Sequence, residues 1–317
     1  MNSSIYYAIS FAVALVVSLA LTPLVRLMAV RLGAVDRPQS RKVHKEPVPL
    51  WGGLAIYAAL VVALAGISVL SATPMTMLMK GIIVGGAFIV VVGMVDDAVG
   101  MPARLKLVFQ IVGALILIGF GVRVDLLTNP FGGGYIYLGG WGVLITIFWV
   151  VAVTNAINLI DGLDGLASGL SGIAALAFFV LSLKFGHLSI SIISMALTGA
   201  CLGFLRYNFN PASIFMGDTG SMLLGYVLAA VSVAGAFKGA AAAMLALPVI
   251  VLGLPIFDVS FAILRRLRKG NPIFQADKEH LHHRLLDRGL SQRRAVMVLY
   301  MIGIACSLLA IYLSNLH

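Results

Sequence analysis

Residues 52–71 read GGLAIYAALVVALAGISVLS, a run of 20 residues without a charged side chain. A helix of about 20 apolar residues is long enough to cross the hydrocarbon core of a bilayer. Similar runs recur along the 317-residue chain, which is 61% hydrophobic and 11% charged. A soluble domain of this length could not cover itself with so few charges. The sequence therefore predicts an all-α polytopic membrane protein, with residues 1–317 as a single integral membrane domain.

We expect ten transmembrane helices, at 5–28, 52–71, 80–95, 105–122, 141–158, 166–184, 188–205, 219–237, 239–262 and 295–313. The first is not expected to be a cleaved signal peptide, because its basic residues follow the apolar run. Pro248, Gly253 and Pro255 predict a kink in the ninth span, which either opens a lipid-facing groove or is simply tolerated. Residues 123–140 contain two strand-like runs around a turn and predict a small external β-hairpin.

Charged residues gather at one face of this topology. With the N-terminus outside, the inward loops hold 18 of the 22 Lys and Arg residues, as the positive-inside rule expects of cytoplasmic loops. Both termini are then external. The same face holds 11 of the 12 acids, which contribute little to topology, so an active site facing the cytoplasm is the natural explanation. The net charge of +10 suits anionic headgroups and phosphorylated substrates, with no indication of nucleic acid.

The first polar cluster, Asp96 and Asp97, ends the third span and is followed by Arg104 and Lys106. Adjacent carboxylates point about 100° apart on a helix, so we do not expect them to chelate one ion as a simple pair. They are either solvated acids at a helix end or functional acids close to the membrane. An acid at the bilayer centre costs about 2.5 to 3.5 kcal/mol, and less at the rim.

The second cluster lies in NAINLIDGLDGLA, residues 155–167, where Asn158, Asp161 and Asp164 recur at intervals of three. On a helix this spacing aligns them along one face as a cation- or hydroxyl-binding strip. Gly162 and Gly165 would let a ligand approach the backbone. A glycine-rich turn between two spans is the alternative interpretation of the same residues.

The third cluster comprises Asn208, Phe215 and the stretch GDTGS at 217–221. Asp218 either merely caps the eighth span or holds a hard cation there, since free amides at a helix start suit a phosphate. Phe215 alone is more typical of packing than of base stacking.

The fourth cluster is KEHLHHRLLDRG, residues 278–289, with His280, His282, His283 and Arg284. No cysteine accompanies these basic residues, which argues against zinc. A clamp for phosphate or sugar oxygens and a solvated basic loop are the remaining interpretations.

Together the four clusters supply acids for Mg²⁺ and amides and bases for phosphates, beside a membrane that holds a lipid. Mg²⁺ usually takes one or two carboxylates plus substrate phosphates. The pattern therefore predicts phosphoryl transfer at the membrane surface. A transporter of phosphorylated lipids or sugar nucleotides is the alternative, although it should place polar groups near mid-bilayer in several spans.

At these motifs the chain resembles the polyprenyl-phosphate N-acetylhexosamine-1-phosphate transferases. The match covers nearly the whole chain, through RKVHKEPVPLWGG, DDAVGMPARLK, NAINLIDGLDGLASG, NFNPASIFMGDTGS and DKEHLHHRLLDRGLS. The HxHHRLL form is similar to the branch that uses UDP-GlcNAc and undecaprenyl phosphate. The branch that uses UDP-MurNAc-pentapeptide carries consecutive histidines instead, and such a donor is the alternative.

The resemblance implies transfer of GlcNAc-1-phosphate to undecaprenyl phosphate with release of UMP. It also implies dependence on Mg²⁺ (with Mn²⁺ as a substitute), homodimers, and a bacterial cytoplasmic membrane location. The product would start O-antigen, enterobacterial common antigen or teichoic acid synthesis. Two departures stand out. Leu50 occupies a position where many relatives have Arg, and ten spans are one fewer than some members of this branch have.

Carried over by motif, the resemblance also implies roles for individual residues. The metal ligands would be Asp218, the leading candidate, and Asp97. The catalytic acids would be Asp96, Asp97, Asp161, Asp164 and Asp218. The substrate-binding residues would be Lys106, Asn158, Asn208, Phe215, His280, His282, His283 and Arg284.

Overall fold

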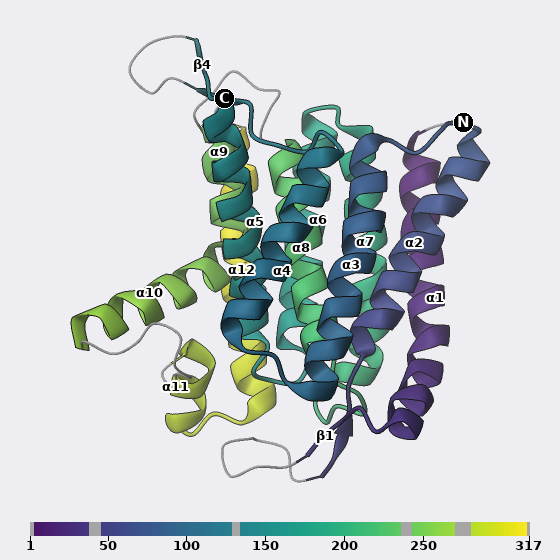
Figure 1. Ribbon diagram of the computed structural model, residues 1–317, viewed down its shortest axis with the longest axis vertical. Helices are drawn as coiled ribbons and strands as arrows, with labels where there is room; N and C mark the ends of the chain where they lie inside the picture. The colour runs from purple at the N-terminus through teal and green to yellow at the C-terminus, as the bar shows by residue number, and fades with distance from the viewer. Residues whose placement is uncertain (1–2, 38–45, 129–133, 236–242, 270–279, 316–317) are drawn as a thin grey trace.

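The computed structural model describes residues 3–37, 46–128, 134–235, 243–269 and 280–315 as a bundle of long helices (Figure 1). Within these ranges, eight helices are long and apolar enough to cross a membrane. They are α1 (Ser3–Leu32), α2 (Gly52–Ser71), α3 (Met77–Val99), α5 (Gly140–Ile160), α6 (Leu166–Lys184), α7 (Leu188–Asn208), α8 (Gly217–Gly235) and α12 (Gln292–Ser314). The all-α prediction is confirmed, and eight of the ten predicted spans correspond to these helices.

The other two predicted spans are not among these eight helices. The fourth corresponds to α4 (Ala103–Gly119), a helix of 17 residues that packs against α3 and α5. The ninth, predicted as one kinked helix over 239–262, is two helices, α9 (Ala243–Val251) and α10 (Gly253–Lys269), and its first four residues lie outside the described residues. Pro255 explains the break at Leu252, because it has no N–H for the carbonyl of Val251 and its ring clashes with that group. Beyond the break, α10 projects away from the bundle (Figure 1).

Two small antiparallel sheets lie at opposite ends of the bundle (Figure 1). The hairpin predicted for residues 123–140 is confirmed as β3 (Leu126–Thr128) and β4 (Tyr135–Tyr137). The second sheet pairs β1 (Val35–Asp36) with β2 (Val48–Pro49) and was not predicted. The N- and C-termini lie at the hairpin end, so both are on one side, as expected. The β1–β2 sheet and the short helix α11 (Leu281–Asp287) lie at the other end.

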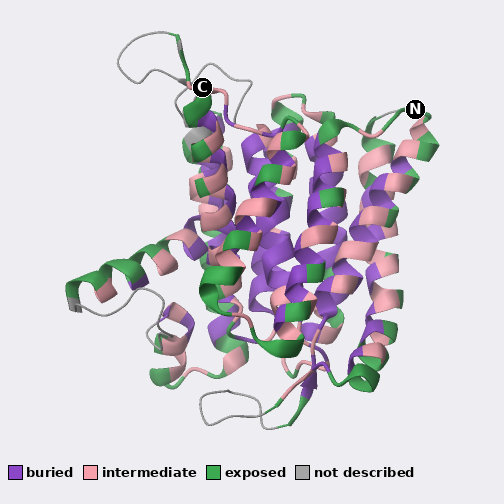
Figure 2. Cartoon of the chain, viewed as in Figure 1, coloured by how far each residue is buried: buried purple, intermediate pink, exposed green. Residues whose placement is uncertain are grey.

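Helix α8 forms the centre of the bundle, and Figure 2 shows its surroundings as the most deeply buried region. Every residue from Thr219 to Val233 is buried. Glycines on the neighbouring helices allow backbone contact with its first turn. A Cβ added to Gly93 of α3 would lie 2.4 Å from the Cα of Thr219, and one added to Gly53 of α2 would lie 2.2 Å from the Cα of Gly220. The start of α8 is therefore fixed between two helices with no room for a side chain.

Candidate active site

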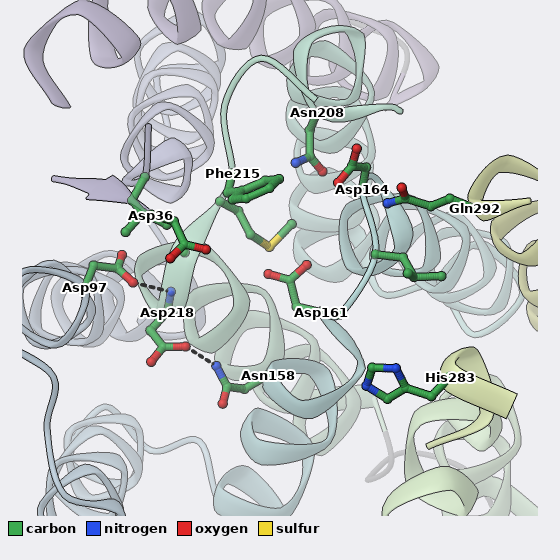
Figure 3. A pocket seen from close by; sticks show the side chains of 15 residues that line it. Asp36, Asp97, Asn158, Asp161, Asp164, Asn208, Phe215, Asp218, His283 and Gln292 are labelled. Atoms are coloured by element: carbon green, nitrogen blue, oxygen red, sulfur yellow. Dashed lines mark hydrogen bonds between the residues drawn. The ribbon is translucent and has the colours of Figure 1, made fainter. Parts of the chain in front are cut away.

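A cavity of about 460 Å³ opens at the end of the bundle that carries β1 and α11, and Figure 3 shows it from close by. It is lined by Asp36, Leu50, Asp97, Asn158, Asp161, Gly162, Leu163, Asp164, Asn208, Phe215, Met216, Gly217, Asp218, His283 and Gln292. The structure thus brings residues from all four predicted clusters to one cavity. Five of the lining residues are acids, so carboxyl groups are the most numerous polar side chains of the cavity wall.

Asp97 faces the start of α8 with both carboxylate oxygens. Its Oδ1 accepts a hydrogen bond from the backbone N–H of Asp218 at 2.8 Å. Its Oδ2 accepts from the backbone N–H of Thr219 at 3.2 Å and from the Thr219 hydroxyl at 2.7 Å. Carboxylates stabilise helix starts because the first amides lack partners in the helix. Asp97 therefore caps α8 from another helix and fixes the residue that carries the next carboxylate, Asp218.

Asp218 is held between a cation and an amide. Lys106 Nζ donates to its Oδ2 at 2.5 Å, and Asn158 Nδ2 donates to its Oδ1 at 2.6 Å. Lys106 also forms an ion pair with Asp96, whose Oδ1 accepts from the backbone N–H of Met101 at 2.6 Å. Lys106 thus bridges Asp96 and Asp218 and offsets part of the negative charge that these acids would otherwise place side by side.

Asp161 differs from the other acids of the cavity. Within the described residues no group donates a hydrogen bond to its carboxylate, which faces the cavity (Figure 3). Asp161 directly follows Ile160, the last residue of α5. Burial raises the pKa of Asp161 to about 8, with smaller contributions from the nearby carboxylates of Asp218 and Asp97. A carboxyl group in this state gains most from a positively charged ligand, because a cation would relieve both its burial and the repulsion.

Asp164 and Asn208 line the cavity and are tied to the protein. The Oδ2 of Asp164 accepts from Asn210 Nδ2 at 2.9 Å and from the backbone N–H of Ala212 at 3.0 Å. Asn208 Oδ1 accepts from the Gly165 N–H at 3.1 Å, and its Nδ2 donates to the Ile214 carbonyl at 3.0 Å. Both side chains therefore shape the loops around the cavity.

The helical interpretation of the second cluster is wrong. Helix α5 ends at Ile160, so Asp161 and Asp164 lie in a glycine-rich turn, where Gly165 adopts a positive φ of 80°. A right-handed helix continued through this segment would need a negative φ at Gly165, whereas the observed φ is in the left-handed region, which glycine adopts without strain. The turn nevertheless keeps Asn158, Asp161 and Asp164 on one cavity.

The three histidines of the fourth cluster have different environments. His283 lines the cavity. His280 Nδ1 lies 2.9 Å from Oδ2 of Asp258 on α10, and its ring stacks on that of His282 with 5.8 Å between the centroids. His282 is buried so closely against the turn that a Cβ on Gly162 would lie 2.3 Å from its Nε2. Burial, with smaller contributions from His283 and His280, lowers the pKa of His282 to about 4.

Of the residues predicted to bind substrate in this segment, only His283 reaches the cavity. Arg284 is exposed and does not line it, while Lys278 and Glu279 lie outside the described residues. His280 and His282 instead connect the segment to α10 and to the glycine-rich turn. The first loop contributes Leu50 to the cavity wall.

Sequence reasoning missed two lining residues, Asp36 and Gln292. Asp36 reaches the cavity because β1 pairs with β2, in a register that places it opposite Val48. Gln292 is the first residue of α12, and its Oε1 accepts from Asn210 Nδ2 at 2.7 Å. Neither residue belongs to a spaced polar motif, so the sequence carried no signal that could have singled them out.

The donor set of the cavity fits a hard divalent cation. Among the described residues, no group of three or more His, Cys, Asp or Glu side chains is arranged to hold a metal by itself. Asp161 and Asp218 nevertheless line the same cavity, and Asp161 has an unbonded carboxylate. Mg²⁺ is commonly bound by one or two carboxylates that substrate phosphates complete. These features define a multi-pass membrane protein with an acid-lined cavity suited to a cation and a phosphorylated ligand.

Comparison with known proteins identifies the family. Residues 79–236 match the model of glycosyl transferase family 4. A probable undecaprenyl-phosphate N-acetylglucosaminyl 1-phosphate transferase of Bacillus subtilis is 42% identical over 307 residues, which cover 97% of this chain and 85% of the relative. A decaprenyl-phosphate N-acetylglucosaminephosphotransferase of Mycobacterium tuberculosis is 41% identical, over 88% and 76% of the two chains. A phospho-N-acetylmuramoyl-pentapeptide-transferase of Shouchella clausii is 31% identical, over 96% and 95%.

The chain belongs to glycosyl transferase family 4, and the predicted resemblance is confirmed. Its identity is higher to the N-acetylglucosaminyl 1-phosphate transferase of B. subtilis than to the pentapeptide transferase, in agreement with the form of its histidine motif.

Proposed function

We propose that this protein transfers GlcNAc-1-phosphate from UDP-GlcNAc to undecaprenyl phosphate, and thereby starts the assembly of a cell-envelope polysaccharide. The observation that carries the proposal is the cavity lined by Asp161 and Asp218, with Lys106 paired to Asp218. It offers sites for a cation and for phosphates at the end of a membrane bundle, where a lipid phosphate can reach them. The B. subtilis relative, which aligns with nearly the whole chain, supports the choice of substrates.

In this reaction a phosphate oxygen of the lipid attacks the phosphorus that carries the sugar, and the bond to UMP breaks. One phosphoanhydride replaces another, so the reaction is expected to be close to balanced and reversible. Catalysis of such transfers rests mainly on positioning and neutralisation of charge. The cavity supplies both, through the fixed carboxylate of Asp218 and the ammonium group of Lys106 beside it.

Asp161 and Asp218 are the residues that would hold Mg²⁺. When bound, the ion would neutralise the diphosphate and the departing UMP. Asp97, predicted above as a ligand, has both oxygens hydrogen-bonded to the start of α8. We therefore assign Asp97 a positioning role, in which it fixes the carboxylate of Asp218.

The lipid nucleophile does not require a general base. A phosphate monoester has its second pKa near 6, so most of the lipid phosphate is a dianion at pH 7. Asp96 and Asp97 lie in the last turn of α3, and both accept hydrogen bonds from donors of the protein. These hydrogen bonds favour a role of Asp96 and Asp97 in positioning Lys106 and Asp218 over a role in proton transfer.

We further propose that the cavity faces the cytoplasm of a bacterium, with both termini external. The distribution of Lys and Arg supports this orientation. Homodimer formation stays a prediction from the family resemblance.

The test is release of UMP by purified protein with undecaprenyl phosphate, Mg²⁺ and UDP-GlcNAc. UDP-MurNAc-pentapeptide and UDP-GalNAc serve as parallel donors. UMP from UDP-GlcNAc alone would support the reaction and the donor. UMP from another donor would keep the mechanism and replace the donor, while no UMP from any donor in folded protein would contradict the proposal. Excess UMP with the lipid product should regenerate UDP-GlcNAc.

A further inference from the structure

One lining side chain, Gln292, has no part in the chemistry described so far. It begins α12 and lines the cavity on the side of Asp164 and His283 (Figure 3). Its Oε1 accepts a hydrogen bond from Asn210 Nδ2 at 2.7 Å. Within the described residues its Nε2 meets no acceptor, so this wall of an otherwise acidic cavity carries an unused neutral donor.

The orientation of the Gln292 amide is fixed by its neighbours. The carboxylate of Asp164 can only accept, so the group that Asn210 turns toward it at 2.9 Å must be the side-chain nitrogen. The same nitrogen lies 2.7 Å from Gln292 and donates its second hydrogen there. Gln292 must therefore present its oxygen to Asn210, which leaves its NH₂ group for a ligand.

The backbone strengthens this arrangement at two points. The N–H of Ala212 donates to the same oxygen of Asp164 at 3.0 Å. Arg293 Nε donates to the backbone carbonyl of Asn210 at 3.0 Å, which ties the loop to the first turn of α12. Asp164, Asn210 and Gln292 thus form a connected series that holds one donor in a single direction.

We propose that Gln292 is a specificity-determining residue whose Nε2 donates a hydrogen bond to the acetamido carbonyl of the donor sugar. The inference rests on the proposed function and goes beyond it by naming the group that reads the sugar. A neutral amide donor suits a neutral carbonyl, while the phosphates would be met by the cation held at Asp161 and Asp218 and by Lys106, which pairs with Asp218. Phe215, the aromatic residue of the lining, lies on the β2 side of the cavity, where its backbone forms hydrogen bonds with the backbone of Pro49 and Gly52.

This inference changes the role of Asp164. Its oxygen anchors Asn210, which in turn orients Gln292, so Asp164 acts through other residues and is a positioning residue. A site built to hydrogen-bond a group of the substrate discriminates strongly against an analogue that lacks it, because its own polar atom is then left unpaired. The wild-type protein should accordingly bind UDP-GlcNAc more tightly than UDP-glucose, which has a hydroxyl at the same carbon.

The test compares dissociation constants for UDP-GlcNAc, UDP-glucose and UMP in the wild type and in Gln292→Leu and Gln292→Glu. Arg294→Gln, an exposed position in the same helical turn, is the matched control. We expect both Gln292 variants to weaken UDP-GlcNAc binding by about 10- to 100-fold, the effect of one lost buried hydrogen bond. Binding of UDP-glucose should change less than about 3-fold and that of UMP should not change. In UMP release the loss should fall on KM and spare kcat.

Asn210→Leu provides an independent arm, since it removes the group that orients Gln292 and should weaken UDP-GlcNAc binding in the same way. If Gln292→Leu fails to fold, the near-isosteric Gln292→Glu decides the question. Equal losses for both sugars, an equal loss for UMP, or equal wild-type affinity for both sugars would each overturn the inference. Failure of the proposed function is distinguishable, because wild-type protein would then release no UMP from any donor.

Discussion

Replacement of Asp97 by Asn tests whether this acid positions α8 or removes a proton from the lipid. The carboxylate accepts three hydrogen bonds from Asp218 and Thr219. In Asp97→Asn one acceptor oxygen becomes an NH₂ group that faces the donors of Thr219, and the negative charge at the helix start is lost. Hydrogen bonds to charged groups contribute about 1.5–3 kcal/mol each, so we expect a loss of stability of about 2 kcal/mol.

The same change should lower activity through Asp218. Loss of the two bonds from Thr219 allows the first turn of α8, which carries Asp218, to shift, and a misplacement of about 1 Å costs roughly 100-fold in rate. The assays are UMP release from pH 6 to 9 and thermal unfolding in detergent, where we expect a midpoint lower by roughly 5 °C. The loss of activity should be nearly constant with pH.

Thr219→Val is the graded comparison, because it removes only the 2.7 Å hydroxyl bond to Asp97. It should shift stability and activity in the same direction, with a loss of about 1 kcal/mol. Asp125→Asn, at the exposed ion pair with Arg123, is the control and should behave as the wild type. Wild-type stability of Asp97→Asn combined with activity that recovers as pH rises would refute the reasoning and assign Asp97 as a base.

Three further predictions concern packing, pH and the cation. Gly93→Val should destabilise the protein by at least about 1–3 kcal/mol in thermal unfolding, since its Cβ would meet the Cα of Thr219. Gly66→Ala is the control and should be neutral or stabilising, because a Cβ there would have no neighbour within 4 Å. The lowered pKa of His282 favours the neutral ring in the folded state. Its contribution to the free energy of unfolding should therefore be complete above pH 6.5, and the free energy of unfolding should fall by about 2 kcal/mol between pH 7 and 5. His282→Gln should abolish that part of the pH dependence in unfolding measurements; an unchanged dependence would exclude His282 as its source. Asp161→Asn should reduce UMP release at least about 100-fold and raise the Mg²⁺ concentration needed for half-maximal activity, and an unaltered Mg²⁺ requirement would contradict its assignment.

Much of the fold followed from the apolar runs, because a helix that spans a bilayer must satisfy its backbone internally. The failure at the ninth span has a local cause. Hydropathy alone joins the residues on both sides of Leu252, while Pro255 interrupts the hydrogen bonding of the helix at that point. A proline usually kinks a membrane helix, and the sequence did not show that the second half would leave the bundle.

The site was predictable where its residues belonged to motifs and unpredictable where they were brought in by pairing. Asn158, Asp161 and Asp218 were singled out by spacing and position, and all three line the cavity. Asp36 enters through a two-residue strand that pairs with Val48 across an intervening loop, and such short pairings leave no periodic pattern. Gln292 enters because the start of α12 packs beside Asn210, a contact between segments 82 residues apart.

The arrangement of the acids depends on the packing of α8. Gly93 lies four residues before Asp97 on α3, so both are on the side of that helix that meets α8. A Cβ at Gly93 would lie 2.4 Å from the Cα of Thr219, a distance that forces the two helices apart. That movement would also lengthen the 2.8 Å bond between Asp97 and the N–H of Asp218. Glycine at this position is therefore required for the hydrogen bond that sets the place of Asp218, although it has no polar group of its own.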